Sequence, residues 1–500
     1  MRSSRDSHDP RRSESPNDPA EPGSPESRVF ERLLRLLAAW ISAATFCSLA
    51  VAAEPIDVGS RLELFVDDYL IDEMTGARLV LNHPAAREVA VDHNEPWEGN
   101  ICCGHTVFRD GDLYRMYYRG RHYDEKSNRE THWFGCYAES TDGVHWTKPE
   151  LELIEFQGSK KNNIILEGPD KFNLAPFKDL NPACKPEERY KAMTNGHGGM
   201  DAYRSPDGIH WSPMAEGHVI TKGAFDSLNL AFWDPTRGSY VEYHRGFREG
   251  IRDIMTGTSD DFLHWTDPVW IEYPGSPPEH LYTNAIKPYY RAPHILMGFP
   301  KRFVPGRQGV PHRHSGVSDA VFMTSRDGLN FHRWNEAFVR PGPQKERWVN
   351  RNNYPAWGIV VTKSDVPGAP DELSLYTTEG YYTGDSCQLR RHTIRIDGFV
   401  SVRAPMAGGE LLTKPIVFDG KELVMNFSTS AAGGVQVELQ DAGGNPVPGF
   451  ALADCPEIFG DEIERVVTWK AGADLASLKG VPVRLRFVLK DADLYSIRFR

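Results

Sequence analysis

The stretch Ser140-Thr141-Asp142-Gly143-Val144-His145-Trp146 decides the fold class, because versions of it recur along most of the chain. Asp-Gly between two alternating runs of residues is a strong β-hairpin signal, since glycine adopts positive φ without steric cost. The tryptophan can cover the hairpin and pack between neighbouring sheets. Further copies occupy 205–211, 259–265 and 325–331, and the last copy, at 395–400, keeps only the Asp-Gly pair.

Each copy belongs to a unit that reads as four strands. Radial repetition of five such units predicts a five-bladed β-propeller over residues 90–403. The fourth strand of a unit is expected directly after the turn, as at 144–147, 263–266 and 399–402.

The segments that flank the repeats have patterns of their own. After Ala404 the residues alternate strictly, as at 435–440 and 483–488, which predicts a β-sandwich over 404–500. Residues 54–89 are expected to add a strand or hairpin before the first blade. The predicted fold class is all-β: a five-bladed β-propeller followed by a C-terminal β-sandwich.

Residues 1–53 read as a disordered leader and a signal peptide. Residues 1–27 are polar. Arg28, Arg32 and Arg35 then lie around the start of an apolar run from Leu33 to Val51, which ends in small residues. A positively charged start, a short apolar stretch and small residues at a cleavage site are typical of a secretory signal peptide. We therefore expect an exported, periplasmic or extracellular protein with no stable membrane insertion after cleavage; a retained membrane anchor is the alternative.

Charge and cysteine patterns exclude several function classes. The formal net charge of -12 argues against a nucleic-acid partner, whose phosphates would be repelled. The six cysteines after residue 53 form no CxxC pair and no zinc-type Cys/His cluster. No cofactor or metal ligand set is predicted. An axial Ca²⁺ held by carboxylate and carbonyl oxygens stays open, and the oligomeric state is not indicated.

The chemistry is expected at the end of the blades away from the Asp-Gly turns. There the start of each first strand meets the finish of each second strand, because neighbouring strands are antiparallel. Four units offer a carboxylate at that start, and these are the candidate catalytic residues: Glu98, Asp179, Asp226 and Glu279. Neighbouring side chains suited to sugar hydroxyls and ring faces are the candidate substrate-binding residues: Trp97, Arg119, Arg245, Tyr282, Asn284 and Arg351.

Gathered carboxylates repel one another, so some pKa values rise while others stay low. Glycoside cleavage needs that division, with one carboxylic acid as proton donor and one carboxylate as base or nucleophile. Glu279 is the predicted acid, because Leu281 and Tyr282 could desolvate it. A single acidic residue beside Asn is more often a turn residue; four at equivalent positions favour a functional set.

The repeats and axial carboxylates resemble the five-bladed propeller glycosidases of glycoside hydrolase families 32 and 43. The order of propeller and sandwich is similar to family 32, and 65–70 (Phe-Val-Asp-Asp-Tyr-Leu) is similar to exported bacterial family-32-like proteins. The chain lacks that family's Trp-Met-Asn-Asp-Pro motif, and Arg252-Asp253-Ile254 matches its Arg-Asp-Pro motif only in part. The resemblance implies that Glu98 is base or nucleophile, with Asp226 or Asp179 in support.

The sequence thus predicts an exported glycoside hydrolase that cleaves a poly- or oligosaccharide with axial propeller carboxylates. The alternative is a non-catalytic propeller that binds carbohydrate or protein. The sugar, the linkage and the stereochemistry of cleavage are not readable from the sequence.

Overall fold

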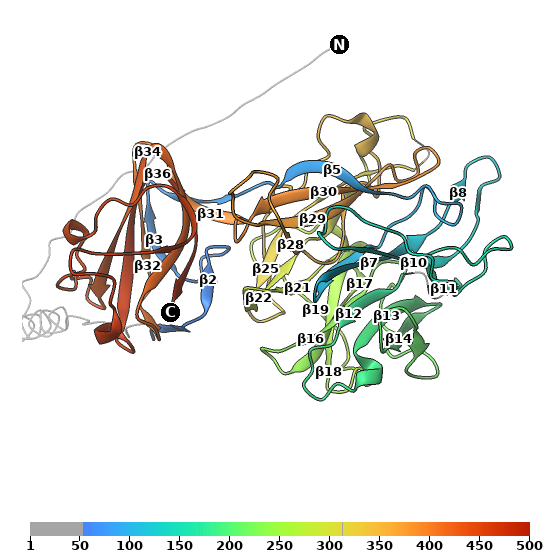
Figure 1. Ribbon diagram of the computed structural model, residues 1–500, viewed down its shortest axis with the longest axis horizontal. Helices are drawn as coiled ribbons and strands as arrows, with labels where there is room; N and C mark the ends of the chain where they lie inside the picture. Colours follow the sequence, from blue (N-terminus) through green and yellow to red (C-terminus); the bar gives the residue numbers. More distant parts are fainter. Residues whose placement is uncertain (1–53, 170, 172, 313) are drawn as a thin grey trace, which may run out of the picture. The chain divides into compact units, whose positions relative to one another are not determined.

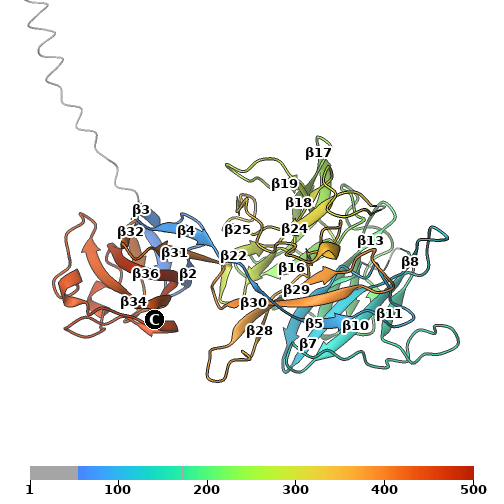
Figure 2. The same ribbon diagram turned by 90° about the horizontal axis from the view of Figure 1, so that it is seen from above.

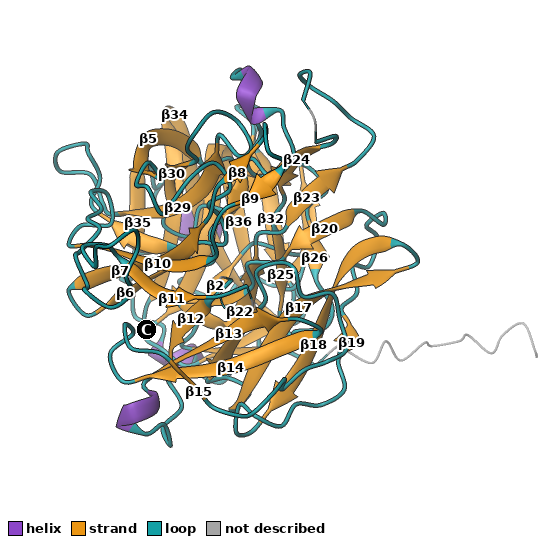
Figure 3. Cartoon of the chain, turned by 90° about the vertical axis from the view of Figure 1, so that its right-hand side faces the viewer, coloured by secondary structure: helices purple, strands orange, loops and turns teal. Residues whose placement is uncertain are grey.

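The computed structural model describes residues 54–169, 171, 173–312 and 314–500, so the predicted leader and signal peptide lie outside the described residues. Pro55–Arg500 form one compact unit. This unit is built from β-strands (Figure 3), which confirms the predicted all-β class. The helices within the described part are four short 3-10 turns: η1 (Pro186–Glu188), η2 (Lys345–Arg347), η3 (Leu452–Asp454) and η4 (Ala476–Leu478).

Three four-stranded antiparallel sheets follow one another in chain order (Figure 1). The first sheet contains β6 (Thr106–Asp110), β7 (Leu113–Gly120), β10 (Phe134–Ser140) and β11 (Ile164–Glu167), and β8 (Tyr123–Asp124) pairs with β9 (Arg129–Glu130) between them. The second sheet contains β12 (Ala175–Lys178), β13 (Tyr190–Gly196), β14 (Gly199–Ser205) and β15 (Ser212–Pro213). The third sheet contains β16 (Leu230–Asp234), β17 (Ser239–Arg248), β18 (Ile251–Ser259) and β19 (Val269–Trp270).

The next two groups of strands are less regular. The fourth group is divided into a four-stranded part, β21 (Lys287–Tyr289), β22 (Ala292–Gly298), β25 (Met323–Ser325) and β26 (His332–Arg333), and a three-stranded part, β20 (His280–Thr283), β23 (Lys301–Val304) and β24 (Val317–Ala320). The fifth sheet contains β27 (Tyr354–Pro355), β28 (Val360–Thr362), β29 (Glu372–Glu379), β30 (Gln388–Arg395) and β5 (Ala85–Asp92).

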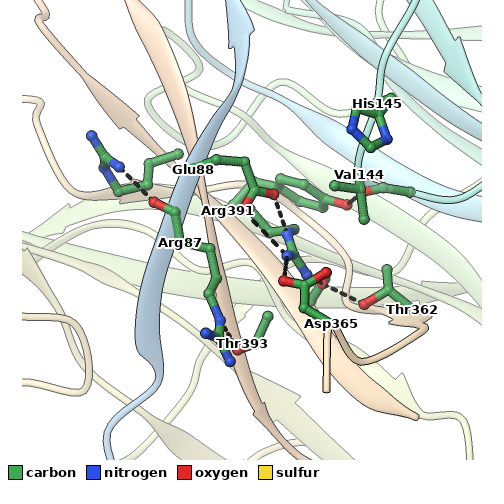
Figure 4. Close-up of polar contacts among 12 residues, drawn as sticks. Arg87, Glu88, Val144, His145, Thr362, Asp365, Arg391 and Thr393 are labelled. Atoms are coloured by element: carbon green, nitrogen blue, oxygen red, sulfur yellow. Dashed lines mark hydrogen bonds and ion pairs between the residues drawn. The ribbon is translucent and has the colours of Figure 1, made fainter. Parts of the chain in front are cut away.

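Strand β5 joins the two ends of this series, because it precedes the first sheet in the chain yet pairs with β30 of the fifth (Figure 2). Side chains reinforce the pairing (Figure 4). The buried Arg391 guanidinium on β30 donates to Glu88 Oε1 on β5 at 2.5 Å and to Asp365 Oδ2 at 3.4 Å. Arg87 Nε donates to Thr393 Oγ1 at 2.8 Å.

The remaining strands form a ten-stranded sheet that combines both ends of the described chain. Its N-terminal strands are β1 (Ile56–Gly59), β2 (Leu62–Leu64), β3 (Ile71–Thr75) and β4 (Arg78–Leu81). Its C-terminal strands are β31 (Val400–Ala404), β32 (Gly409–Thr413), β33 (Ile416–Phe418), β34 (Leu423–Asp441), β35 (Asp461–Val466) and β36 (Val483–Phe499). On β36 the alternating Val483, Leu485, Phe487 and Leu489 are buried, as the sequence pattern predicts.

The segment 54–89 is therefore shared between two sheets instead of being added before the first one. β2 pairs with β36 and β3 with β32, while β5 belongs to the fifth sheet. Leu62 and Leu64 are buried by these contacts. Pairing between residues more than 400 positions apart leaves no local signal, because hydrophobic periodicity reports only the face of a strand and not its partner.

The repeated Asp-Gly turn is held by its own side chains. Gly143, at φ +75°, donates its N–H to Ser140 Oγ at 2.8 Å. Asp142 Oδ1 accepts from the N–H groups of Val144 and His145 at 2.7 and 2.8 Å. The same pair of backbone N–H groups is bound by each equivalent aspartate, namely Asp207, Asp261 and Asp327.

The predicted positions of the fourth strands are wrong in three of the sheets. In the first sheet the fourth strand is β11, not 144–147, and in the third it is β19, not 263–266. Residues 399–402 overlap β31 of the ten-stranded sheet, and β5 takes the place predicted for them. The reason is that the turn aspartate already binds the N–H groups that a strand starting at 144 would offer to a neighbour.

Candidate functional site

A buried tyrosine on β20, Tyr282, lies among four cationic side chains. Lys301 Nζ is 4.0 Å from the centre of the Tyr282 ring. The guanidinium carbons of Arg245, Arg252 and Arg351 are 4.7, 5.2 and 5.9 Å from the same point. Four cationic groups within about 6 Å of one ring are a marked concentration of charge. We call these five residues the Tyr282 cluster.

The cluster residues come from three groups of strands, the third, the fourth and the fifth in chain order. Arg245 and Arg252 lie on the neighbouring strands β17 and β18, whose register places Arg252 opposite Phe247. The backbone N–H of Arg252 donates to His280 Nδ1 at 3.1 Å, which connects β18 to β20. Lys301 begins β23, opposite Thr283 of β20. The cluster therefore forms where second strands meet the start of first strands, as the antiparallel topology predicts.

The loops of the fifth sheet close the cluster and connect it to the first sheet. Arg351 lies before β27 and donates from Nη1 to the hydroxyls of Tyr381 and Tyr382 at 2.9 and 3.1 Å. Arg119, on β7 of the first sheet, donates from Nη2 to the same Tyr381 hydroxyl at 2.6 Å. Four predicted substrate-binding residues, Arg119, Arg245, Tyr282 and Arg351, are thus brought together by elements far apart in the chain.

Electrostatics within the cluster are dominated by positive charge. Burial lowers the pKa of Lys301 well below its ordinary value, and the neighbouring Arg351 lowers it further. Burial alone would raise the pKa of Tyr282, but Arg351 and Arg245 outweigh it, so this pKa lies below its ordinary value. Tyr282 is therefore more acidic than an exposed tyrosine, which suits it to proton transfer.

The cations of the cluster have few anionic partners. Among the described residues, Asp226 is the one carboxylate in salt-bridge contact with any of them, and it binds the Arg245 guanidinium. The buried Nε atoms of Arg245, Arg252 and Arg351 have no hydrogen-bond partner in the described chain. Buried donors are nearly always paired in folded proteins, so unpaired ones call for an explanation, such as a bound ligand or water.

Glu98 lies elsewhere, near the end of β5, and its carboxylate has several partners within the chain. Its carboxylate accepts from Tyr118 Oη at 2.5 Å and Lys148 Nζ at 2.7 Å, and His93 Nδ1 is 3.6 Å away. Burial alone would raise the pKa of Glu98, but His93 and Lys148 lower it to about 2. The side chain is 0% exposed, so its charge is compensated by these neighbouring groups and not by water.

Asp179 is also a buried carboxylate with partners in the chain, but it lies at the end of its sheet opposite to the one predicted. It follows the last residue of β12, whereas the sequence placed it before the first strand. Asp179 Oδ2 accepts from Lys191 Nζ at 2.5 Å and Tyr240 Oη at 2.6 Å. The first strand was misplaced because β12 is four residues long, includes Pro176 and shows no alternation of its own.

Asp226 and Glu279 are the two candidate carboxylates with solvent access. The Asp226 side chain is 73% exposed and is paired with Arg245. The Glu279 side chain is 27% exposed and lies 3.2 Å from both Arg302 and Arg333. Glu279 directly precedes β20, so both carboxylates stand beside the elements that carry the Tyr282 cluster.

Trp97 and Asn284 contact other parts of the chain. Trp97 Nε1 donates to Asn163 Oδ1 at 2.6 Å. Asn284 Nδ2 donates to the Tyr243 carbonyl at 3.1 Å, and its Oδ1 accepts from the Ile286 N–H at 3.1 Å. Asn284 thereby supports the break between β20 and β21. The cluster residues outside the predicted substrate-binding set are Arg252, which was noted only in a partial motif match, and Lys301, whose place at the end of a predicted second strand was a signal for it.

Three further features bear on function. Within the described ranges, no group of three or more His, Cys, Asp or Glu side chains is arranged to hold a metal ion. No helix in the same residues has the length and apolarity needed to cross a membrane. All six cysteines of the described chain are free thiols, as Cys102 and Cys455 illustrate.

No protein-family model and no curated protein matches the chain. Solved structures do resemble it at low identity. An endo-1,4-beta-xylanase from Bacteroides thetaiotaomicron is 10% identical with a TM-score of 0.42, covering 61% of this chain and 96% of its own. A fructofuranosidase from Schwanniomyces occidentalis is 13% identical with a TM-score of 0.38, covering 84% and 98%. An N-acetylgalactosamine deacetylase from F. plautii is 14% identical with a TM-score of 0.37, covering 69% and 95%. The function proposed below therefore rests on the contacts of this chain itself.

Proposed function

We propose that this protein is an exported glycoside hydrolase that cleaves an oligo- or polysaccharide at the Tyr282 cluster. In this proposal the five groups of strands are the blades of a propeller closed by β5, and residues 404–500 form a sandwich that β1 to β4 complete. The observation that carries it is the meeting of Arg119, Arg245, Tyr282 and Arg351 from four sheets at the end where first strands begin. Aromatic faces and fixed hydrogen-bond donors of this kind suit a carbohydrate.

Asp226 and Glu279 are the carboxylates we assign to the reaction. They come from the third and fourth groups of strands and keep solvent access, whereas Glu98 and Asp179 have 0% side-chain exposure. Hydrolysis of a glycoside needs one proton donor and one base or nucleophile. The buried pair is therefore removed from the catalytic set that the sequence suggested, and the exposed pair is retained.

One observation favours the non-catalytic alternative. Asp226 is already paired with Arg245, and Glu279 with Arg302 and Arg333. Carboxylates neutralised in this way can hold arginines in place for binding without taking part in proton transfer. A carbohydrate-binding propeller therefore remains the second candidate function.

A panel of poly- and oligosaccharides incubated with the protein, with reducing ends as the readout, separates the two. We expect new reducing ends from at least one substrate. Glu279→Gln and Asp226→Asn should each lower turnover by roughly 10²–10⁴-fold while substrate affinity changes little. The matched control is Asp461→Asn, an exposed aspartate of the ten-stranded sheet that is paired with Arg395 of the fifth sheet. Binding without turnover, or full activity of both variants, contradicts hydrolysis by this pair.

A further inference from the structure

The Tyr282 cluster carries more positive charge than its surroundings neutralise. Four basic side chains contact one ring, and in the described chain Asp226 is the single carboxylate in salt-bridge contact with them. The other local carboxylates are engaged with other arginines, such as Asp253 with Arg248. Like charges at low dielectric repel strongly, so a fold gains nothing by gathering them.

The guanidinium N–H donors of the cluster also indicate that it binds an anion. The Arg252 side chain lies over Tyr282 and Phe303, and no salt bridge to it exists in the described residues. The Nε atoms of Arg245, Arg252 and Arg351 are buried and unpaired in this part of the chain. Guanidinium groups bind carboxylate and sulfate oxygens with two parallel N–H donors, which is a geometry that a neutral hydroxyl cannot reproduce.

We propose that Arg245, Arg252 and Arg351 bind an anionic group of the saccharide, so that the substrates are acidic glycans bearing carboxylate or sulfate. This inference rests on the proposed function for the saccharide, and it adds the charge of the substrate. The neighbouring Tyr282 supplies a ring face and a hydroxyl at the same place. Overall the chain is negative, with a formal net charge of -12, so a local positive site gives selectivity for a bound acidic unit over non-specific polyanion adsorption.

The test uses pairs of polymers that differ only in charge. Polygalacturonate is compared with its fully methyl-esterified form, and a sulfated galactan with its desulfated form, by calorimetric titration against the full secreted protein. We expect binding of one charged member of these pairs and at least tenfold weaker binding of its neutral counterpart. The pair that shows the difference identifies carboxylate or sulfate as the bound group.

Arg252→Gln is the decisive variant, because this side chain has no carboxylate to leave unpaired. It should weaken binding of the charged polymer at least about tenfold, the usual value of one charge-assisted hydrogen bond, and change binding of the neutral counterpart far less. The matched control is Arg248→Gln on the same β17–β18 hairpin, whose guanidinium is paired with Asp253 and Glu272. It should leave binding unchanged, and circular dichroism checks that both variants are folded.

The outcomes separate this inference from the proposed function. Arg252-dependent binding of an acidic polymer without cleavage supports the inference and overturns hydrolysis. Cleavage of a neutral polymer with equal affinity for wild type and Arg252→Gln supports hydrolysis and overturns the inference. Equal affinity for the charged and neutral members of both pairs also overturns it.

Discussion

Two buried charged sites in this protein are built in opposite ways. The Glu98 carboxylate has Tyr118, Lys148 and His93 around it, so its charge is compensated within the chain. The Tyr282 cluster gathers four cations and leaves guanidinium donors unpaired. The first arrangement is what a fold needs when it buries a charge, and the second is what a binding site needs. Function in this protein is therefore expected where the compensation is incomplete.

The largest loss of stability is expected when the buried ion pair between Lys191 and Asp179 in the second sheet is broken. Lys191 is 2% exposed and binds Asp179, which raises the pKa of Lys191 above its ordinary value. Lys191→Met should destabilise the fold by about 3–5 kcal/mol, because Asp179 is left charged and buried. Chemical denaturation measures this loss, and the double variant Lys191→Met/Asp179→Leu should recover much of it. A double variant as unstable as the single one contradicts the argument.

Glu98→Gln should cost somewhat less, about 3 kcal/mol at pH 7. This value follows from the pKa of Glu98, which falls from 4.5 to about 2 on folding. Because the folded pKa is depressed, the stabilisation is present above about pH 4.5 and is lost as the pH falls toward 2. Urea unfolding at pH 7 and at pH 3 should therefore show a smaller gap between wild type and variant at pH 3. A gap independent of pH contradicts the assignment of charge to Glu98.

The sequence indicated the end of the strands at which the cluster lies, because antiparallel strands force the finish of β7 and β17 to one side. It therefore brought Arg119 and Arg245 into the candidate site. It could not separate exposed from buried carboxylates: Glu98 is covered by His93, which is placed by the pairing of β5 with β30. That pairing joins residues about 300 positions apart, which no local pattern reports.

Arg252→Met should change stability in the opposite direction from Glu98→Gln. It removes one of several like charges and keeps an apolar side chain against Tyr282 and Phe303. We expect a fold that is unchanged or up to about 1 kcal/mol more stable, since relief of repulsion offsets the lost cation–π contact. Thermal unfolding at low salt measures the difference, which should shrink as salt screens the charges. A loss of more than about 1 kcal/mol would show that Arg252 serves the fold.

The smallest effect is expected at the exposed turns, which supply a third kind of charged site. His145 Nδ1 lies 2.8 Å from Asp142 Oδ2, and this contact raises the pKa of the histidine. In the copy at 325–331 the Asn330 amide makes the same contact with Asp327 at 2.8 Å, so a neutral donor suffices. His145→Asn should therefore leave the urea midpoint unchanged at pH 8.

Any difference for His145→Asn should appear only at low pH, with a defined sign. A histidine whose pKa is raised on folding adds stability below its unfolded pKa of 6.5, and this is lost as the pH rises through the folded value. Wild type should thus exceed the variant slightly at pH 5.5 and equal it at pH 8. His145→Ala, which removes the donor altogether, is the control that reports the hydrogen bond itself. A gap between wild type and His145→Asn that persists at pH 8 would mean that the turn needs the imidazole ring, which the asparagine in the Asp327 copy argues against.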